Sequence, residues 1–188
     1  MKPEDRIYNA YFVQKGEKMY YNQIKETTML SHSSLQNTLA RMSRQGILKT
    51  EKTRQNVYYS ISDKKIIAIK FSEIAIRKFN SLNIGVKSPL RTFLKDLPIS
   101  IYTIVLFGSA STGDQNQNSD IDLLIVYYKK TDLDKRRKEA EITSKYPLSL
   151  FYCSAEQFIR SNDDIIIQAK KTGFPIHKEQ NFYEAIIE

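Results

Sequence analysis

The 188-residue sequence predicts an α/β (α+β) protein that is helical in its front part and built on a mixed sheet in its back part. Two changes of periodicity support this prediction. Up to Gly46 apolar residues recur at helical spacing, whereas residues 47–52 and 56–61 alternate like two strands around a polar turn. Further along, helical stretches alternate with three apolar runs of strand length, at residues 101–107, 120–126 and 148–153. Such alternation indicates a sheet covered by helices.

The composition is typical of a globular protein from a reducing compartment. Apolar residues make up 41% of the chain, and the single cysteine, Cys153, excludes an internal disulfide. The N-terminus is charged and lacks an apolar core, so we expect no signal peptide. No uncharged apolar stretch reaches the length of a membrane span. We therefore expect a cytoplasmic protein.

The net charge of +8 is concentrated in the front half of the chain. Residues 1–62 carry ten basic and five acidic side chains, and residues 63–100 carry eight and three. Residues 101–188 carry eleven basic and thirteen acidic side chains. A basic front part favours a polyanionic partner for that part, and a solvated lysine-rich surface is the alternative.

Two short helices are expected at the front. The Pro-Glu-Asp start at residues 3–5 suits a first helical turn, because proline presets φ and acidic side chains favour the helix dipole. This helix covers residues 3–15 with Gly16 as its stop, and a second helix covers residues 21–27.

A third helix begins after Ser31, a good N-cap, runs to about Arg44 and ends at Gly46. One stripe of this helix is apolar and should face the core: Leu35, Leu39 and Met42. The opposite side carries small polar and basic residues: Ser33, Asn37, Arg41 and Arg44. An exposed helix face of this composition can enter a DNA major groove and pair with base edges.

Three helices followed by a basic hairpin is the order of a winged helix-turn-helix. The stretch YYNQIKETTMLSHSSLQNTLARMSRQGILKTEKTRQNVYYSIS resembles the archaeal and bacterial winged-helix regulators, and the resemblance covers residues 5–62. It implies binding to double-stranded DNA, with the third helix in the major groove. Wing residues Lys49, Lys52 and Arg54 would then meet phosphates. The alternative is a winged helix that makes protein contacts only.

Residues 63–82 form a long and unusually apolar helical candidate. Such a helix must pack against the second domain or against the same helix of another chain, and the second alternative predicts a homodimer through residues 63–82. Residues 83–89 mark a break, and Ser88 is the expected cap of a short helix from Pro89 to Leu97. The expected division is a DNA-binding domain at 1–62, a linking helix at 63–87 and a mixed-sheet domain at 88–188.

Residues 101–125, IYTIVLFGSASTGDQNQNSDIDLLI, hold the clearest chemical pattern. A buried strand ends at Gly108 and Ser109, and Asp120 and Asp122 follow in a second apolar strand. Side chains alternate along a strand, so the two aspartates point the same way, roughly 7 Å apart. A buried carboxylate pair needs a cation, and Mg²⁺ bound by one or two carboxylates plus substrate phosphates is the common one.

This pattern resembles the signature of the nucleotidyltransferase superfamily related to DNA polymerase β, and most closely its minimal nucleotidyltransferases. The resemblance covers about residues 88–178 and implies that Mg²⁺ (or Mn²⁺) and a nucleoside triphosphate (NTP) bind here. Asp120 and Asp122 would be the catalytic metal ligands, while Gly108 and Ser109 would hold the phosphates. A glycine lets a triphosphate approach the backbone, and the free N–H groups after it can bind phosphate oxygens.

The sequence departs from this signature at two positions. Many members carry an arginine where Thr112 stands. The third carboxylate of the family lies on the next strand, where aligning the run Leu-Ser-Leu-Phe places Ser149. A hydroxyl is a poor magnesium ligand and a poor base compared with a carboxylate. Glu156 and Asp114 are the candidates for a substitute.

Two functions therefore stay open. The first is a DNA-binding protein whose nucleotidyltransferase domain moves a nucleoside monophosphate from a metal-bound NTP to a hydroxyl acceptor, with a partner protein as one candidate acceptor. The second is a catalytically degenerate transcriptional regulator whose domain only binds nucleotide or a partner protein. The missing third carboxylate favours the second function, whereas the intact Gly-Ser and Asp-x-Asp pattern favours the first.

Overall fold

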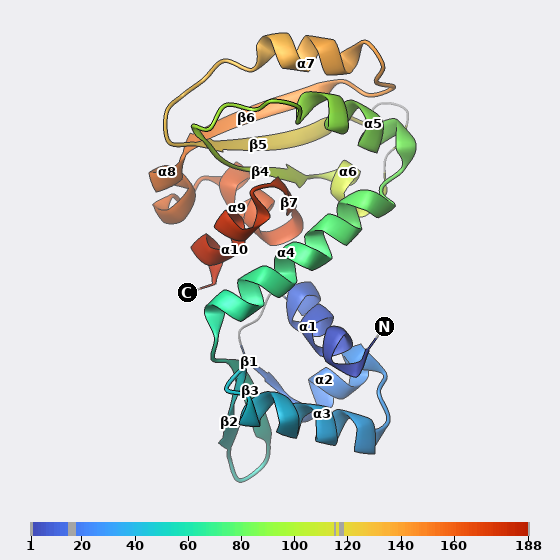
Figure 1. Cartoon of the computed structure of the whole chain (residues 1–188), viewed down its shortest axis with the longest axis vertical. Coiled ribbons are helices and arrows are strands. Elements are labelled where there is room, and N and C mark those ends of the chain that lie inside the picture. The colour runs from blue at the N-terminus through green and yellow to red at the C-terminus, as the bar shows by residue number, and fades with distance from the viewer. Residues whose placement is uncertain (1, 15–17, 115, 117–118, 188) are drawn as a thin grey trace. The chain divides into compact units, whose positions relative to one another are not determined.

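The computed structural model describes residues 2–14, 18–114, 116 and 119–187. The chain divides into two compact units, the first ending at Ile74 and the second running from Ala75 to Ile186 (Figure 1). The helix stop predicted at Gly16 lies outside the described residues. No helix in the described ranges is long and apolar enough to cross a membrane.

The first unit combines three helices with a small antiparallel sheet. Its strands pair in the order β1-β3-β2, and the β2–β3 hairpin projects as a long loop-tipped ribbon (Figure 1). The elements along the chain are α1 (Pro3–Gln14), β1 (Lys18–Tyr20), α2 (Tyr21–Thr28), α3 (His32–Arg44), β2 (Leu48–Lys52) and β3 (Val57–Ile61). The three predicted helices and both predicted strands are confirmed within one or two residues.

Strand β1 was not expected from the sequence. Its three residues pair with β3 in antiparallel register, Lys18 with Ser60 and Tyr20 with Tyr58. Three residues are too few for the alternation of a strand to be recognised in the sequence. The strand forms because β3 offers a free edge with which it can pair.

Helix α3 begins and ends as its sequence predicts. The Ser31 side chain accepts a hydrogen bond from the Ser34 N–H at 3.3 Å, which caps the first turn. At the other end Gly46 has φ 73°, a left-handed conformation that favours glycine. The apolar stripe is completely buried, as predicted: Leu35, Leu39 and Met42.

Helix α4 (Lys64–Ser81) contains the boundary between the two units. Its start is capped by Asp63, whose Oδ1 accepts a hydrogen bond from the Ile66 N–H at 3.0 Å. The boundary after Ile74 lies inside this helix, whereas the sequence division assigned the whole of residues 63–87 to a linker. Along the same helix, Ile69 and Ile76 each stay 45% exposed.

The second unit is a four-stranded mixed sheet with helices on both sides. The strand order is β6-β5-β4-β7, in which β5 and β6 are parallel and the other neighbours antiparallel. Figure 1 shows α7, with α5, on one side of the sheet and α9 and α10 on the other. The strands are β4 (Ile101–Phe107), β5 (Ile121–Tyr127), β6 (Leu148–Ser154) and β7 (Phe174–His177). The helices are α5 (Ile84–Phe93), α6 (Ser109–Thr112), α7 (Asp134–Glu141), α8 (Ala155–Arg160), α9 (Asp164–Thr172) and α10 (Glu179–Ile186).

Helix α5 corrects one prediction. The sequence placed a helix from Pro89 to Leu97 with Ser88 as its cap, but the helix starts at Ile84 and contains Pro89. The Asn83 side chain accepts a hydrogen bond from the Gly85 N–H at 2.8 Å and so supplies the cap. The proline removes one helical hydrogen bond, yet it is buried on the apolar face of the helix, with Val86, Leu90 and Phe93. Packing of this apolar face outweighs the tendency of Pro89 to break the helix.

Candidate active site

The turn after β4 requires glycine at position 108. Gly108 has φ 66° and ψ −160°, a backbone conformation that only glycine adopts readily. A Cβ atom there would lie 2.3 Å from Oδ2 of Asp122, which is closer than two such atoms can approach. The chain therefore presents bare backbone beside the Asp122 carboxylate.

Helix α6 follows this turn directly and is a single turn long. It runs from Ser109 to Thr112, and the N–H of Gly113, its C-cap, donates to the Ser109 carbonyl at 3.0 Å. Thr112 stands where the family often has arginine. Its side chain is exposed, and its hydroxyl donates to the same carbonyl at 3.1 Å. A short neutral side chain therefore replaces the long cation at this position.

Two carboxylates lie beside the turn. Asp120 is exposed immediately before β5, and Asp122 is half-buried within that strand. Antiparallel pairing of Phe107 with Asp122 puts the second carboxylate next to the end of β4. Burial raises the pKa of Asp122 above its ordinary value, and the charge of Asp120 raises it further. The site thus concentrates negative charge that a cation would stabilise.

Ser149 reaches the same place from the neighbouring strand. Strands β5 and β6 are parallel, and Ser149 pairs with Asp122 in register. The Ser149 hydroxyl donates a hydrogen bond to Oδ2 of Asp120 at 2.9 Å. The position aligned with the family's third carboxylate therefore lies beside the two aspartates, and a hydroxyl donor occupies it.

Glu156 does not replace that carboxylate. It belongs to α8, beyond the far end of β6, and the strand from Ser149 to Ser154 alone spans roughly 16 Å. Its carboxylate pairs instead with Arg160 at 3.1 Å, on the surface. The interpretation of Glu156 as a substitute is therefore wrong.

Asp114 lies closer to the site than Glu156. Its N–H donates to the Ser109 carbonyl at 3.2 Å, which keeps its backbone near α6, and its side chain is exposed. Among the described residues, however, no three histidine, cysteine, aspartate or glutamate side chains gather closely enough to hold a metal ion. Any cation here would depend on the two aspartates.

The residues present fit one divalent cation together with its nucleotide. Mg²⁺ is usually held by one or two carboxylates and completes its coordination with phosphate oxygens and water. Asp120 and Asp122 would be these carboxylates, and the bare backbone at Gly108 leaves the space that phosphates need. The raised pKa of Asp122 in the free protein is consistent with a carboxylate arranged for a positive partner.

The residues predicted to bind DNA lie on two elements of the first unit. Helix α3 and the β2–β3 hairpin expose all of them to solvent: Ser33, Asn37, Arg41, Arg44, Lys49, Lys52 and Arg54. Some of these side chains are engaged within the unit. Arg44 donates through Nε to the Ala40 carbonyl at 3.4 Å, and the Ser33 hydroxyl lies 3.4 Å from that of Ser31. The Arg41 guanidinium donates to Glu4 of α1 at 3.0 Å and forms an ion pair with it. The sequence offered no sign of this ion pair between residues far apart in the chain.

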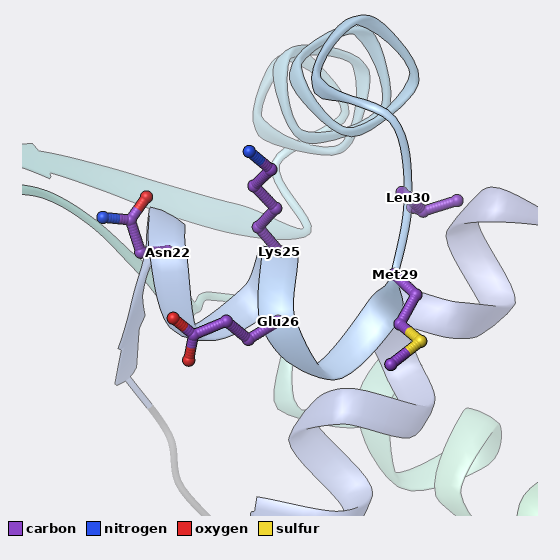
Figure 2. A pocket seen from close by; sticks show the side chains of 5 residues that line it. All are labelled: Asn22, Lys25, Glu26, Met29 and Leu30. Atoms are coloured by element: carbon purple, nitrogen blue, oxygen red, sulfur yellow. The ribbon is translucent and has the colours of Figure 1, made fainter.

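The surface of α2 next to this region is hollowed. The hollow measures about 630 Å³ and is lined by five residues of α2 and the turn after it: Asn22, Lys25, Glu26, Met29 and Leu30. Figure 2 shows the Lys25 and Met29 side chains pointing in opposite directions from this stretch. Met29 is 86% exposed and has φ 52°, so an apolar side chain stands in solvent where α2 ends. The lining combines one basic, one acidic and several uncharged side chains, and this mixture does not indicate a particular ligand.

Comparison with known proteins agrees with the geometry of the second unit. Residues 88–173 match the family described as "Nucleotidyltransferase domain". A protein of Methanocaldococcus jannaschii that is named a protein adenylyltransferase is 36% identical over 62 residues. That match covers 33% of this chain and 60% of the relative. No solved structure matches the chain. Residues 88–173 therefore resemble a nucleotidyltransferase domain, and the second unit has mixed α+β architecture.

Proposed function

We propose that this chain is a DNA-binding protein whose nucleotidyltransferase domain binds an NTP with Mg²⁺ (or Mn²⁺) and transfers the nucleoside monophosphate to a hydroxyl acceptor. The observation that carries the proposal is the contact between Gly108 and Asp122. The backbone at Gly108 has no room for a Cβ atom and lies beside two aspartates. A triphosphate needs close approach to the backbone and a cation to neutralise its charge, and this arrangement supports both.

The reaction would be an in-line displacement at the α-phosphorus. The acceptor oxygen forms a bond to phosphorus, the bond to the β,γ-pyrophosphate breaks, and the hydroxyl proton leaves to solvent or to a base. A bound Mg²⁺ supplies charge neutralisation for the developing negative oxygens. Asp120 and Asp122 would orient that cation, while the backbone after Gly108 would hold the phosphates.

The acceptor is proposed to be a side-chain hydroxyl of a protein. Support comes from the relative in Methanocaldococcus jannaschii, which is named a protein adenylyltransferase. The chain spans only 60% of that relative, so its acceptor is carried over as a proposal, along with the preference for ATP among NTPs.

A second candidate is a regulator that binds nucleotide without transferring it. Ser149 supports this candidate, because its hydroxyl donates to Asp120 and leaves no carboxylate on β6 to act as a base. A serine hydroxyl loses its proton far too reluctantly for that role near neutral pH. In this case the nucleotide would act as a ligand that changes DNA or protein binding.

The first unit is proposed to be a winged helix-turn-helix that binds double-stranded DNA. Its element order α1-β1-α2-α3-β2-β3 and its sheet order β1-β3-β2 support this, together with the exposed polar face of α3. A homodimer through residues 63–82 remains part of the proposal. It is supported by Ile69 and Ile76, which lie two helical turns apart and are both exposed.

The decisive experiment offers the protein each of the four labelled NTPs with Mg²⁺ or Mn²⁺. Label transferred to protein, and lost in Asp120→Ala and Asp122→Ala, is the expected result. Metal-dependent nucleotide binding without transfer would instead support the regulator. Absence of both transfer and binding would exclude the two candidates together.

A further inference from the structure

Strand β6 forms one edge of the four-stranded sheet, since the strand order is β6-β5-β4-β7. A groove of about 390 Å³ lies along this edge. Its lining combines residues 148–152 of β6 with Asp134 and Arg137 of α7. Residues 149–152 are half-buried, whereas their partners in β5, residues 122–125, are buried apart from Asp122. The edge of β6 is therefore accessible from the groove.

The backbone of β6 alternates between two directions. In a parallel ladder, the N–H and C=O of one residue point to the neighbouring strand, and those of the next residue point away from it. The Pro147 carbonyl accepts a hydrogen bond from the Ile121 N–H of β5 at 2.9 Å. The Leu148 N–H belongs to the same planar peptide unit and therefore points away from β5. It donates to Oε1 of Glu141 at 2.9 Å.

The outward backbone groups of β6 are satisfied at both ends of the strand and open between them. By the same alternation Leu150, Tyr152 and Ser154 also direct their N–H groups outward. The Ser154 N–H donates to Oε1 of Gln157 at 2.9 Å. Among the residues that the structure describes, no side chain, loop or helix accepts a hydrogen bond from the N–H of Leu150 or of Tyr152. An unpaired stretch of this kind is what an added strand requires.

The groove reaches the candidate active site through Ser149. This residue lines the groove, and its hydroxyl donates to Asp120 at 2.9 Å. Across the sheet the order at this level is Gly108 after the end of β4, Asp122 on β5 and Ser149 on β6. A further strand would lie about 4.8 Å beyond β6. A side chain on it beside Ser149 would face the aspartates from the side opposite to Gly108.

This order suits the displacement that the domain is proposed to perform. The attacking oxygen and the leaving pyrophosphate must lie on opposite sides of the α-phosphorus. With the phosphates held after Gly108, the edge of β6 is the opposite side. A hydroxyl presented there forms the new bond to phosphorus, the bond to pyrophosphate breaks, and the hydroxyl proton passes to solvent.

We infer that the edge of β6 binds the acceptor protein, as an extended segment that adds a fifth strand to the sheet and presents a serine, threonine or tyrosine hydroxyl beside Ser149. This inference rests on the proposed function, because the hydroxyl is an acceptor only if an NTP binds at Gly108 and the two aspartates. It adds how the domain recognises a protein: through main-chain hydrogen bonds to Leu150 and Tyr152.

The first test offers the protein, with Mg²⁺ and labelled ATP, a synthetic peptide of alternating threonine and valine with a lysine at each end. This composition favours extended structure. An analogue with N-methyl groups on alternate residues carries the same side chains but cannot pair along a strand edge. We expect label on the unmodified peptide and about tenfold less on the analogue. In hydrogen exchange, only the unmodified peptide should protect the N–H groups of Leu150 and Tyr152.

The second test changes the edge itself. Leu150→Pro removes an outward N–H and places the proline ring on the edge, while the hydrogen bonds to β5 come from the neighbouring residues. Leu150→Ala is the matched control, because it shortens the side chain and keeps the N–H. We expect the proline variant to lose about tenfold in transfer to the peptide and the alanine variant to keep most of it. Calorimetry should give both variants the wild-type affinity for ATP with Mg²⁺.

The outcomes separate the inference from the proposed function. If ATP binds but the unmodified peptide neither accepts label nor protects the edge, the inference is wrong and the nucleotide site stands. Equal labelling of the peptide and its N-methylated analogue also overturns the inference, whether or not any variant folds. A wild-type dimer that Leu150→Pro converts to a monomer would show that a second copy occupies the edge, which overturns it too. If no NTP binds, the proposed function fails, and the acceptor site falls with it.

Discussion

The two regions proposed to bind ligands differ in how tightly their parts are packed. Around Gly108 the groups touch: a Cβ would lie 2.3 Å from Asp122, and the Ser149 hydroxyl lies 2.9 Å from Asp120. Along α3 and the β2–β3 hairpin the residues predicted to bind DNA are exposed to solvent, and a few of them, such as Arg41, make single surface contacts. The side chains around Gly108 fit together in only one arrangement, whereas those on the exposed surface of α3 and the hairpin can adopt many conformations.

This difference teaches how each region should respond to substitution. In the crowded region one change disturbs backbone, carboxylates and neighbouring strand together, so its effects should be large and non-additive. On the open surface each cation acts independently through charge, so effects should be small and should add. The predictions below test this contrast, from the largest expected effect to the smallest.

The largest effect is expected from Asp122→Asn. Loss of one carboxylate should lower transfer, or metal-dependent nucleotide binding, on the order of 10²-fold or more. The free protein should nevertheless become more stable. The folded-state pKa of Asp122 is raised, so the folded state holds its proton where the unfolded chain has lost it, and stability falls as pH rises through that window.

Asparagine has no proton to lose, so the variant should melt at a higher temperature than the wild-type protein at neutral pH. The gap should vanish in acid, below the ordinary pKa of aspartate. Thermal unfolding without metal at both pH values measures this. A variant less stable than the wild-type protein at neutral pH would contradict the prediction.

Ser149→Asp should restore the third carboxylate. If catalysis lacks only this group, transfer should rise by up to about 10²-fold, the usual contribution of a positioned base. Without metal the third negative charge should lower the melting temperature, and Mg²⁺ should recover it. Ser149→Asn, which adds similar bulk without charge, is the matched control. Equal transfer rates for the two variants would show that the absence of a third carboxylate does not limit catalysis.

Gly108→Ala tests the crowding directly. It should lose about 1–3 kcal/mol in free energy of unfolding, together with nucleotide binding, because both backbone strain and the contact with Asp122 oppose it. Gly113→Ala is the matched control, since φ is 89° there and nothing lies within 4 Å of the new Cβ. It should lose only about 1 kcal/mol and keep nucleotide binding. Urea unfolding compares the two, and similar losses would refute the crowding.

The smallest effects are expected on the DNA-binding surface. Replacing Arg44, Lys52 or Arg54 by alanine should each lower the salt dependence of DNA affinity by about one unit of slope, with additive losses. Glu4→Gln should raise affinity slightly, because it releases Arg41 from an ion pair worth about 0–1 kcal/mol. Fluorescence anisotropy over a salt series measures both changes. Affinity that does not vary with salt would contradict DNA binding by this surface.

Prediction from the sequence succeeded where short-range signals agreed with one another. Helix α3 has its N-cap, its apolar stripe and its glycine stop within one segment, and all three are confirmed. Prediction failed where a distant contact decided the outcome. Strand β1 exists because β3 pairs with it, and α5 extends through Pro89 because that face is buried.

By itself the sequence determined the local chemistry of this protein: a glycine turn, two aspartates on one face of a strand, and a basic polar helix face. These follow from spacing along one segment, where neighbouring residues have few arrangements available. Only the tertiary structure decided which strand lies beside the aspartates, and hence that Ser149 meets Asp120 and that Glu156 does not. That choice depends on pairing between segments far apart in the chain, whose entropic cost is repaid only by the packed sheet as a whole.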